Sequence, residues 1–109
     1  MAHDEQLATR VREELEDRPD VTSKRMFGSL AFLVGGSLAC CVQSDGLLVR
    51  LPPEEAAAAL AEPGTRPFVM SGRPARGWVV VDLDAVAGPG ELRHWVGRGV
   101  ESATALAPR

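Results

Sequence analysis

Arginine is the residue type in this sequence with the clearest capacity for molecular recognition. Arg66, Arg73 and Arg76 lie in a stretch without a carboxylate (residues 63–78), and Arg25 begins a second glycine-containing stretch. A guanidinium group presents a planar fork of donors that matches a carboxylate or a phosphate. If the downstream stretch folds back over a sheet as a loop, these side chains can meet one anion. The sequence therefore predicts a binding surface made by the four arginines.

The same arginines have a second interpretation that involves no ligand. They are then solvated, or they form ion pairs with carboxylates of a preceding helix, Glu54, Glu55 and Glu62. Nucleic acid is the weaker choice of ligand, because a few arginines beside an acidic N-terminal segment give a small electrostatic footprint. No aromatic platform is interleaved with them. Small-anion or nucleic-acid binding through Arg66, Arg73 and Arg76 is therefore kept as the alternative function.

The other reactive side chains do not form a catalytic or metal-binding pattern. Cys40 and Cys41 are adjacent, which is neither a zinc nor a redox spacing, and on a strand they point to opposite faces. His94 is expected on the exposed flank of a helix. Asp82 and Asp84 provide too few ligands for a calcium loop. We therefore predict no enzymatic activity, no metal site and no cofactor.

Composition indicates one ordinary globular domain over residues 1–109. Hydrophobic residues make up 45% of the chain and charged residues 25%. The net charge of −3 gives no overall field that attracts nucleic acid or an anionic membrane. The N-terminus lacks the features of a signal peptide, and no apolar run approaches the ~20 residues that span a bilayer. We expect a cytoplasmic protein that does not bind membranes.

The hydrophobic pattern predicts a helix, three strands, a helix, two strands and a final helix. Leu7, Val11 and Leu15 recur at helical spacing, and a similar stripe around Trp95 marks the last helix and predicts that Trp95 is mostly buried. The expected bounds are a helix from residue 3 or 4 to about 17, strands at 24–34, 37–43 and 47–51, a helix from residue 52, strands at 66–70 and 77–83 around a loop at 71–76, and a helix after residue 90.

Turn signals predict how the strands pair. Gly35-Gly36 suits the positive φ angles of a tight hairpin, and Ser44-Asp45-Gly46 signals a second one. The expected fold is α+β in two layers, with a single, mainly antiparallel five-stranded sheet and helices packed on one face. The open face would then present apolar side chains, namely Ala31, Leu33, Ala39 and Leu48. A patch of this kind predicts a homodimer.

Two glycine-containing stretches carry a resemblance to a known family. One is Arg25-Met26-Phe27-Gly28, and the other is Arg66-Pro67-Phe68 followed by Gly72-Arg73-Pro74 and Gly77-Trp78. In this order they resemble the TfoX N-terminal domain family, small bacterial proteins named after the Sxy/TfoX competence regulators. The resemblance extends from about residue 24 to residue 105. Ser29 departs from it, because the family usually shows a second glycine there.

The resemblance implies a non-catalytic regulatory or protein-interaction module with kinship to competence and transcriptional regulators. The family offers no catalytic residues that could be assigned to this chain. The regulators that gave the family its name carry a second, C-terminal domain, so we expect a stand-alone N-terminal domain here. The expected partners are a second copy of the chain and a regulatory protein.

Overall fold

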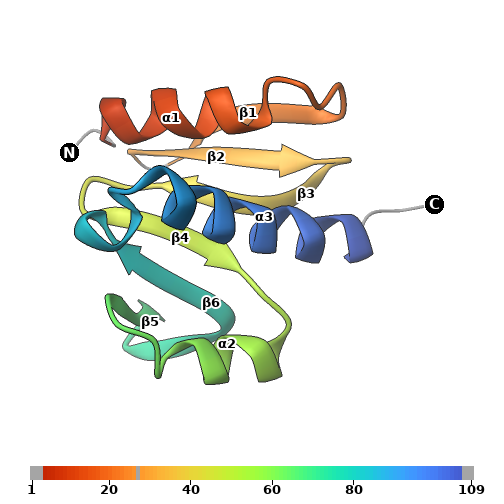
Figure 1. The fold of residues 1–109 in the computed structure, drawn as a ribbon. Helices are drawn as coiled ribbons and strands as arrows, with labels where there is room; N and C mark the ends of the chain where they lie inside the picture. Colours follow the sequence, from red (N-terminus) through yellow and green to blue (C-terminus); the bar gives the residue numbers. More distant parts are fainter. Residues whose placement is uncertain (1–3, 27, 107–109) are drawn as a thin grey trace.

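Six antiparallel strands form one open sheet in the computed structural model, whose described part covers residues 4–26 and 28–106 (Figure 1). The strand order β1-β2-β3-β4-β6-β5 places a four-stranded meander beside a hairpin, with β5 at one edge. The α+β class and the antiparallel sheet predicted from the sequence are confirmed. The strands are β1 (Val21–Met26), β2 (Ser29–Val34), β3 (Ser37–Val42), β4 (Gly46–Arg50), β5 (Thr65–Met70) and β6 (Arg73–Asp82).

The sixth strand arises from a turn that the hydrophobic pattern does not predict. The prediction of a single strand over residues 24–34 is wrong. Instead, β1 and β2 are separate strands that pair antiparallel, with Met26 opposite Ser29. Gly28 lies between them with φ at +80°. Strand β1 is an exposed edge strand and therefore lacks the apolar alternation that marks a half-buried strand. Phe27 of the first family-like stretch and residue 3, a predicted helix start, lie outside the described residues.

The helices cover one face of the sheet. In α1, the side chains of Leu7, Val11 and Leu15 are buried as predicted, and the Asp4 carboxylate caps the helix by accepting a hydrogen bond from the Leu7 N–H at 2.8 Å. Trp95 is 5% exposed, which confirms its predicted burial. The helical elements are α1 (Glu5–Leu15), α2 (Pro53–Ala59), the short 3₁₀ helix η1 (Leu83–Val86) and α3 (Pro89–Leu106).

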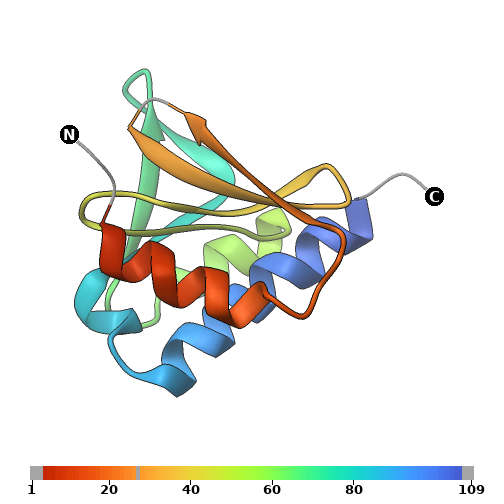
Figure 2. The same ribbon diagram turned by 90° about the horizontal axis from the view of Figure 1, so that it is seen from above.

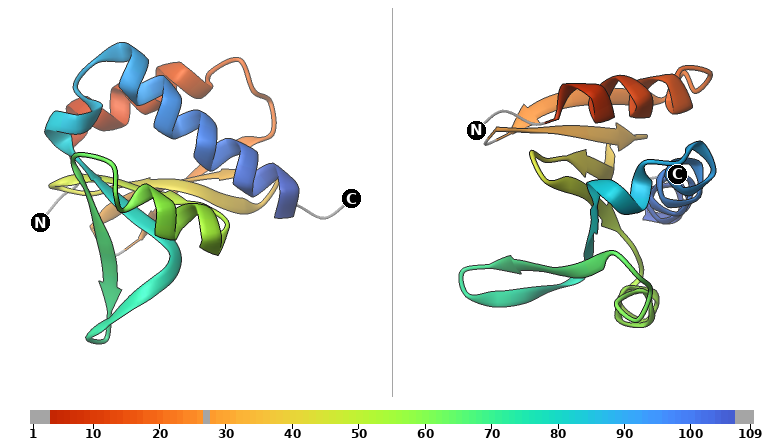
Figure 3. Two further views of the ribbon diagram at one scale, coloured as in Figure 1. Left: turned by 60° about the horizontal axis from the view of Figure 1, so that its bottom comes forward. Right: turned by 60° about the vertical axis from the view of Figure 1, so that its left-hand side comes forward.

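The sheet is strongly curled, with the helices on its convex side (Figures 2 and 3). The right-hand view of Figure 3 shows β1–β2 and the β5–β6 hairpin projecting to the same side of β3 and β4. The ladder between β5 and β6 is irregular at the bend, where the register shifts between Pro67 and Val69. Gly77 lies in this region with φ at +84°, a conformation that other residues adopt only with strain. Its carbonyl accepts a hydrogen bond from the Leu51 N–H at 2.9 Å, which ties the bend to the end of β4.

Both faces of the sheet carry apolar clusters, and this changes the predicted open patch. Ala31 and Leu48 were expected outside, but they are 0% and 5% exposed because Met26, Phe68 and Trp78 pack against their cluster. Of the four residues predicted outside, only Leu33 is half-buried on that face.

A bulge in β3 moves the fourth residue of the predicted patch to the other side. Leu33 pairs with Leu38 whereas Phe32 pairs with Cys40, so Ala39 is an extra residue between two ladder positions. Ala39 is fully buried and clusters with Ala103 of α3. The prediction that Ala39 faces outward is therefore wrong, because strict alternation fails at a bulge.

The prediction of a loop at residues 71–76 is also wrong. Strand β6 begins at Arg73, and only Ser71 and Gly72 separate it from β5. Both turn residues have positive φ angles, 52° and 78°, as a tight hairpin turn requires. Pro67 lies in the edge strand β5, where a missing N–H donor is tolerated. Arg73 and Arg76 are therefore strand residues of a hairpin arm rather than members of a flexible loop.

Candidate functional site

The face of the sheet opposite the helices is the first candidate site, and we call it the concave face. A buried floor is made by Ala31, Cys41, Leu48 and Val80. Half-buried apolar side chains surround this floor: Met26, Leu33, Leu38, Phe68 and Trp78. The rings of Phe68 and Trp78 meet edge to face with their centroids 6.5 Å apart.

The charges of the chain are separated between the strands and the rest of the molecule. Residues 21–50 and 65–82, which hold the whole sheet, contain six cations and only two carboxylates. The remaining residues contain six cations and thirteen carboxylates. The overall charge of −3 therefore conceals a positive sheet and a negative helical side.

Arg66 is the predicted site residue whose charge is already neutralised. Its Nε lies 2.8 Å from the Asp82 carboxylate, and its NH2 lies 2.9 Å from the Asp45 carboxylate. The hydrogen bond with Asp82 is the main cause that raises the pKa of Arg66, with a further contribution from Asp45. These partners are not the glutamates considered from the sequence. Arg66 connects β5 to β6 and to the turn before β4, which is a structural task.

The other predicted arginines are exposed but do not form one cluster. Arg25 is paired with Leu30 of the helix-side core, so its side chain belongs to the helix side of the edge strand. Arg73 stands at the hairpin turn, four residues along β5–β6 from Arg66, a separation of about 13 Å in an extended strand. Arg76 lines a groove of about 190 Å³ between α2 and the hairpin, beside Trp78. Their role in binding stays a prediction.

Two cations of the concave face were missed by the sequence analysis. Arg50 is paired with Trp78 across β4 and β6, and its guanidinium carbon lies 5.5 Å from the Trp78 ring centroid. Lys24 is paired with Ala31 and therefore points to the same face. Neither forms an ion pair within residues 4–26 and 28–106. Both cations reach the concave face through the register between neighbouring strands. A local sequence pattern does not show that register.

The adjacent thiols are not activated for chemistry. Cys40 faces the helix-side core and Cys41 the concave floor, as alternation predicts, but both are buried. Burial raises the pKa of the Cys40 thiol to about 12, with a smaller contribution from Cys41. Burial also raises the pKa of Cys41, and a hydrogen bond with Ser29 offsets part of that rise. A nucleophilic cysteine requires the opposite shift.

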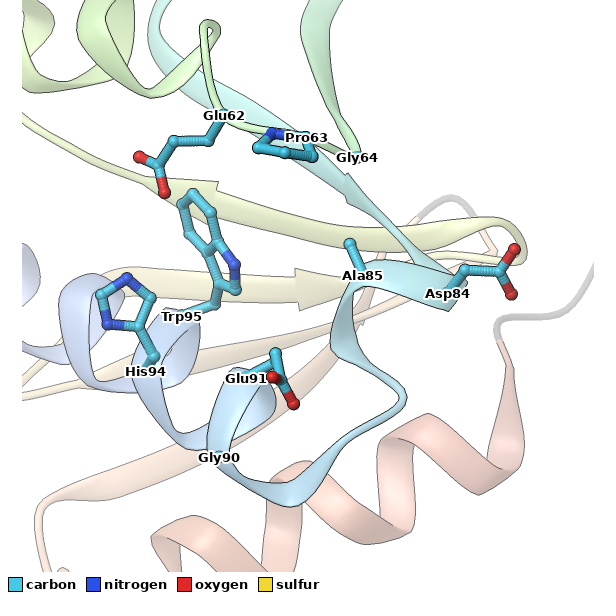
Figure 4. A pocket seen from close by; sticks show the side chains of 9 residues that line it. All are labelled: Glu62, Pro63, Gly64, Asp84, Ala85, Gly90, Glu91, His94 and Trp95. Atoms are coloured by element: carbon cyan, nitrogen blue, oxygen red, sulfur yellow. The ribbon is translucent and has the colours of Figure 1, made fainter.

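A second concave region lies on the helix side, and we call it the α3 hollow (Figure 4). It is a shallow, open depression of about 800 Å³ between the start of α3, η1 and the connection from α2 to β5. Its side chains include Asp84, Glu91, His94 and Trp95. His94 is exposed, as predicted from the sequence. Among the described residues, no group of three His, Cys, Asp or Glu side chains is arranged to hold a metal ion.

Comparison with protein-family models identifies the family of this chain. The model of the TfoX N-terminal domain matches residues 2–103. The chain belongs to the TfoX N-terminal domain family. A search of curated proteins found no match to this chain. Within the described ranges, no helix has the length and apolar character needed to cross a bilayer.

The two stretches that carried the family resemblance both contribute to the concave face. Met26, from the first stretch, ends β1, and Phe68 and Trp78, from the second, lie in β5 and β6. All three pack against the same buried floor. Separated parts of the family pattern therefore meet on the face that no helix covers.

Proposed function

We propose that this chain is a non-catalytic interaction module that binds an acidic, partly apolar surface of another protein through its concave face. The observation that carries this proposal is the half-buried apolar rim around Trp78, on a sheet whose charge is positive. Exposed apolar patches on small domains mark binding surfaces. Interfaces favour aromatic residues and arginine, and Phe68, Trp78 and Arg50 provide both.

The positive charge near the concave face favours an acidic partner. Lys24 and Arg50 lie on the concave face, and Arg76 lines the neighbouring groove beside Trp78. None of the three forms an ion pair inside the described part of the chain. An acidic partner would satisfy these cations and gain association rate by electrostatic steering. Two copies related by a two-fold axis at this face would instead oppose cation to cation. The homodimer expected from the sequence stays a prediction, and we rank the acidic partner before it.

Site-specific photocrosslinking tests the proposal. A photoreactive phenylalanine analogue at Leu38 samples the concave face. The same analogue at Ala58, an exposed position of α2 outside the groove of Arg76 and Trp78, is the matched control. We expect Leu38 to crosslink a protein segment that is rich in Asp and Glu. The triple variant Lys24→Gln, Arg50→Gln, Arg76→Gln should lose that adduct. The variant Arg12→Gln, Arg18→Gln, Arg93→Gln removes the same charge from exposed helix-side positions and should keep it.

Other adducts would overturn the proposal in recognisable ways. A crosslink from Leu38 to a second copy would return the homodimer to first place. An adduct with DNA or RNA would favour the second candidate, a nucleic-acid-binding module, for which the Phe68–Trp78 pair beneath Arg50 is the specific support. The same adducts from Leu38 and Ala58 would show that the concave face has no selectivity.

A further inference from the structure

The charged side chains that line the α3 hollow are negative in the described part of the chain. Asp84 and Glu91 are exposed, and neither forms an ion pair within the described residues. Glu62, on the opposite side, is held by Arg98 at 3.1 Å. The described residues that line the hollow include neither lysine nor arginine. Carboxylates alone do not define a ligand, because a first-turn position already suits a negative charge.

Trp95 supplies an independent indication. Its side chain is 5% exposed, and Figure 4 shows the indole nitrogen directed into the hollow. The indole N–H is a donor with no acceptor capacity, and it makes no hydrogen bond within residues 4–26 and 28–106. Buried tryptophan N–H groups usually have an acceptor, and an unmet donor costs free energy.

The contacts around Trp95 hold the ring in this orientation. The Arg98 guanidinium carbon lies 4.6 Å from the indole centroid, over the ring. The His94 ring meets the indole edge to face, with the centroids 5.5 Å apart. Arg98 is in turn fixed by Glu62. The donor edge of the indole is therefore presented to the hollow by a preorganised set of side chains.

We propose that the α3 hollow binds a basic peptide segment of a partner protein. A backbone carbonyl of that segment accepts the hydrogen bond from Trp95, and a neighbouring arginine or lysine side chain lies beside Asp84 and Glu91. A metal ion does not fit, because no set of three ligands converges here among the described residues. A polyamine would satisfy the charge but offers no oxygen acceptor to the indole. The proposal is independent of the concave face, which has the opposite charge.

Nuclear magnetic resonance on the intact chain tests this site directly. The sequence contains two tryptophans, so a ¹⁵N-labelled sample gives two indole N–H signals. Trp78 lies on the other face of the sheet and is the internal control. The probe is the capped peptide acetyl-Gly-Arg-Gly-Arg-Gly-amide. We expect a saturable downfield shift of the Trp95 indole signal, with the Trp78 signal unchanged.

Matched variants and a second probe make the outcome decisive. The double variant Asp84→Asn, Glu91→Gln should raise the Kd of the peptide about threefold to tenfold. The control Glu54→Gln, Glu55→Gln removes two exposed carboxylates from the first turn of α2 and should leave the Kd unchanged. No saturable shift of Trp95 would overturn the proposal. An equal shift with spermidine would overturn the carbonyl contact, and this wild-type comparison holds even if the double variant fails to fold.

Discussion

On the helix side of the sheet Phe32, Val49 and Val81 are buried beneath helices, whereas on the concave side Phe68 and Trp78 are only half-buried. Both faces belong to the same strands, so the difference is not one of hydrophobic content. It lies in what covers each face. The helix side is complete within the chain, and its residues serve stability. The apolar rim of the concave side is incomplete, and a partner would complete it.

The two tryptophans show the same difference between a covered and an open face. Trp95 is 5% exposed and packs between α3 and the sheet, with Arg98 over its ring. Trp78 lies on a strand with one side toward solvent and Arg50 beside it. Both have a cation near the ring, but only one is enclosed. Substitution of each in turn separates a residue needed for folding from a residue available for binding.

The largest expected effect is therefore that of Trp95→Ala. This variant should lower the free energy of unfolding by about 3–5 kcal/mol, because it leaves a large cavity in the helix-side core. Trp78→Ala should cost only about 1–2 kcal/mol, from partial burial and a partly exposed cation–π contact. Urea unfolding of both variants measures the difference. Equal losses would contradict the distinction between the two faces.

The second prediction compares two glycines on opposite sides of α3. A Cβ at Gly99 would lie 2.5 Å from the Ala39 carbonyl oxygen, so the helix crosses the sheet there in direct backbone contact. Gly99→Ala should cost about 1–3 kcal/mol by overpacking. A Cβ at Gly97 would have no neighbour within 4 Å, and Gly97→Ala should gain about 1 kcal/mol from helix propensity. Thermal unfolding measures the direction of both stability changes. A gain in stability for Gly99→Ala would show that α3 packs less closely against the sheet than the structure indicates.

The sequence predicted those parts of the fold that depend on local periodicity and turn chemistry. The buried stripe of α1, the burial of Trp95 and the Gly35-Gly36 hairpin follow from spacing and backbone freedom. The β1–β2 turn was missed because β1 is a polar edge strand whose pattern resembles a loop. Ala39 was placed on the wrong face because a bulge shifts side-chain alternation, and a bulge depends on the partner strand.

The candidate site was harder to predict from the sequence than the fold was. Arg66 was chosen for the absence of nearby carboxylates along the chain, yet its partners Asp45 and Asp82 come from the neighbouring turn and strand. Arg50 was overlooked because its contact with Trp78 exists only through the pairing of β4 with β6. The contacts of both arginines depend on how neighbouring strands pair. The periodicity of a single strand carries no information about that pairing.

The third prediction uses the two thiols, one on each face. A thiol whose folded pKa lies above its unfolded value keeps its proton when the unfolded chain has lost it, so the fold loses stability as pH rises. For Cys40 this window runs from about pH 9 to about pH 12, with a slope of at most about 1.4 kcal/mol per pH unit. Cys40→Ala should flatten the loss more than Cys41→Ala, because Ser29 offsets part of the shift at Cys41. Equal slopes in alkaline urea titrations would contradict this.

The smallest expected effect separates the predicted arginines from one another. Arg66 connects two carboxylates, but all three side chains are 42–64% exposed, so solvent weakens each pair. Arg66→Gln should therefore lower the free energy of unfolding by about 1 kcal/mol, and 1 M salt should reduce that loss. Arg73→Gln, at an exposed position by the hairpin turn, should change stability by less than about 0.5 kcal/mol at any salt concentration. Urea midpoints of the two variants at low and high salt make the comparison. A salt-independent loss for Arg66→Gln would mean that its contribution is packing rather than charge, and a loss of equal size for Arg73→Gln would mean that the hairpin turn depends on that arginine.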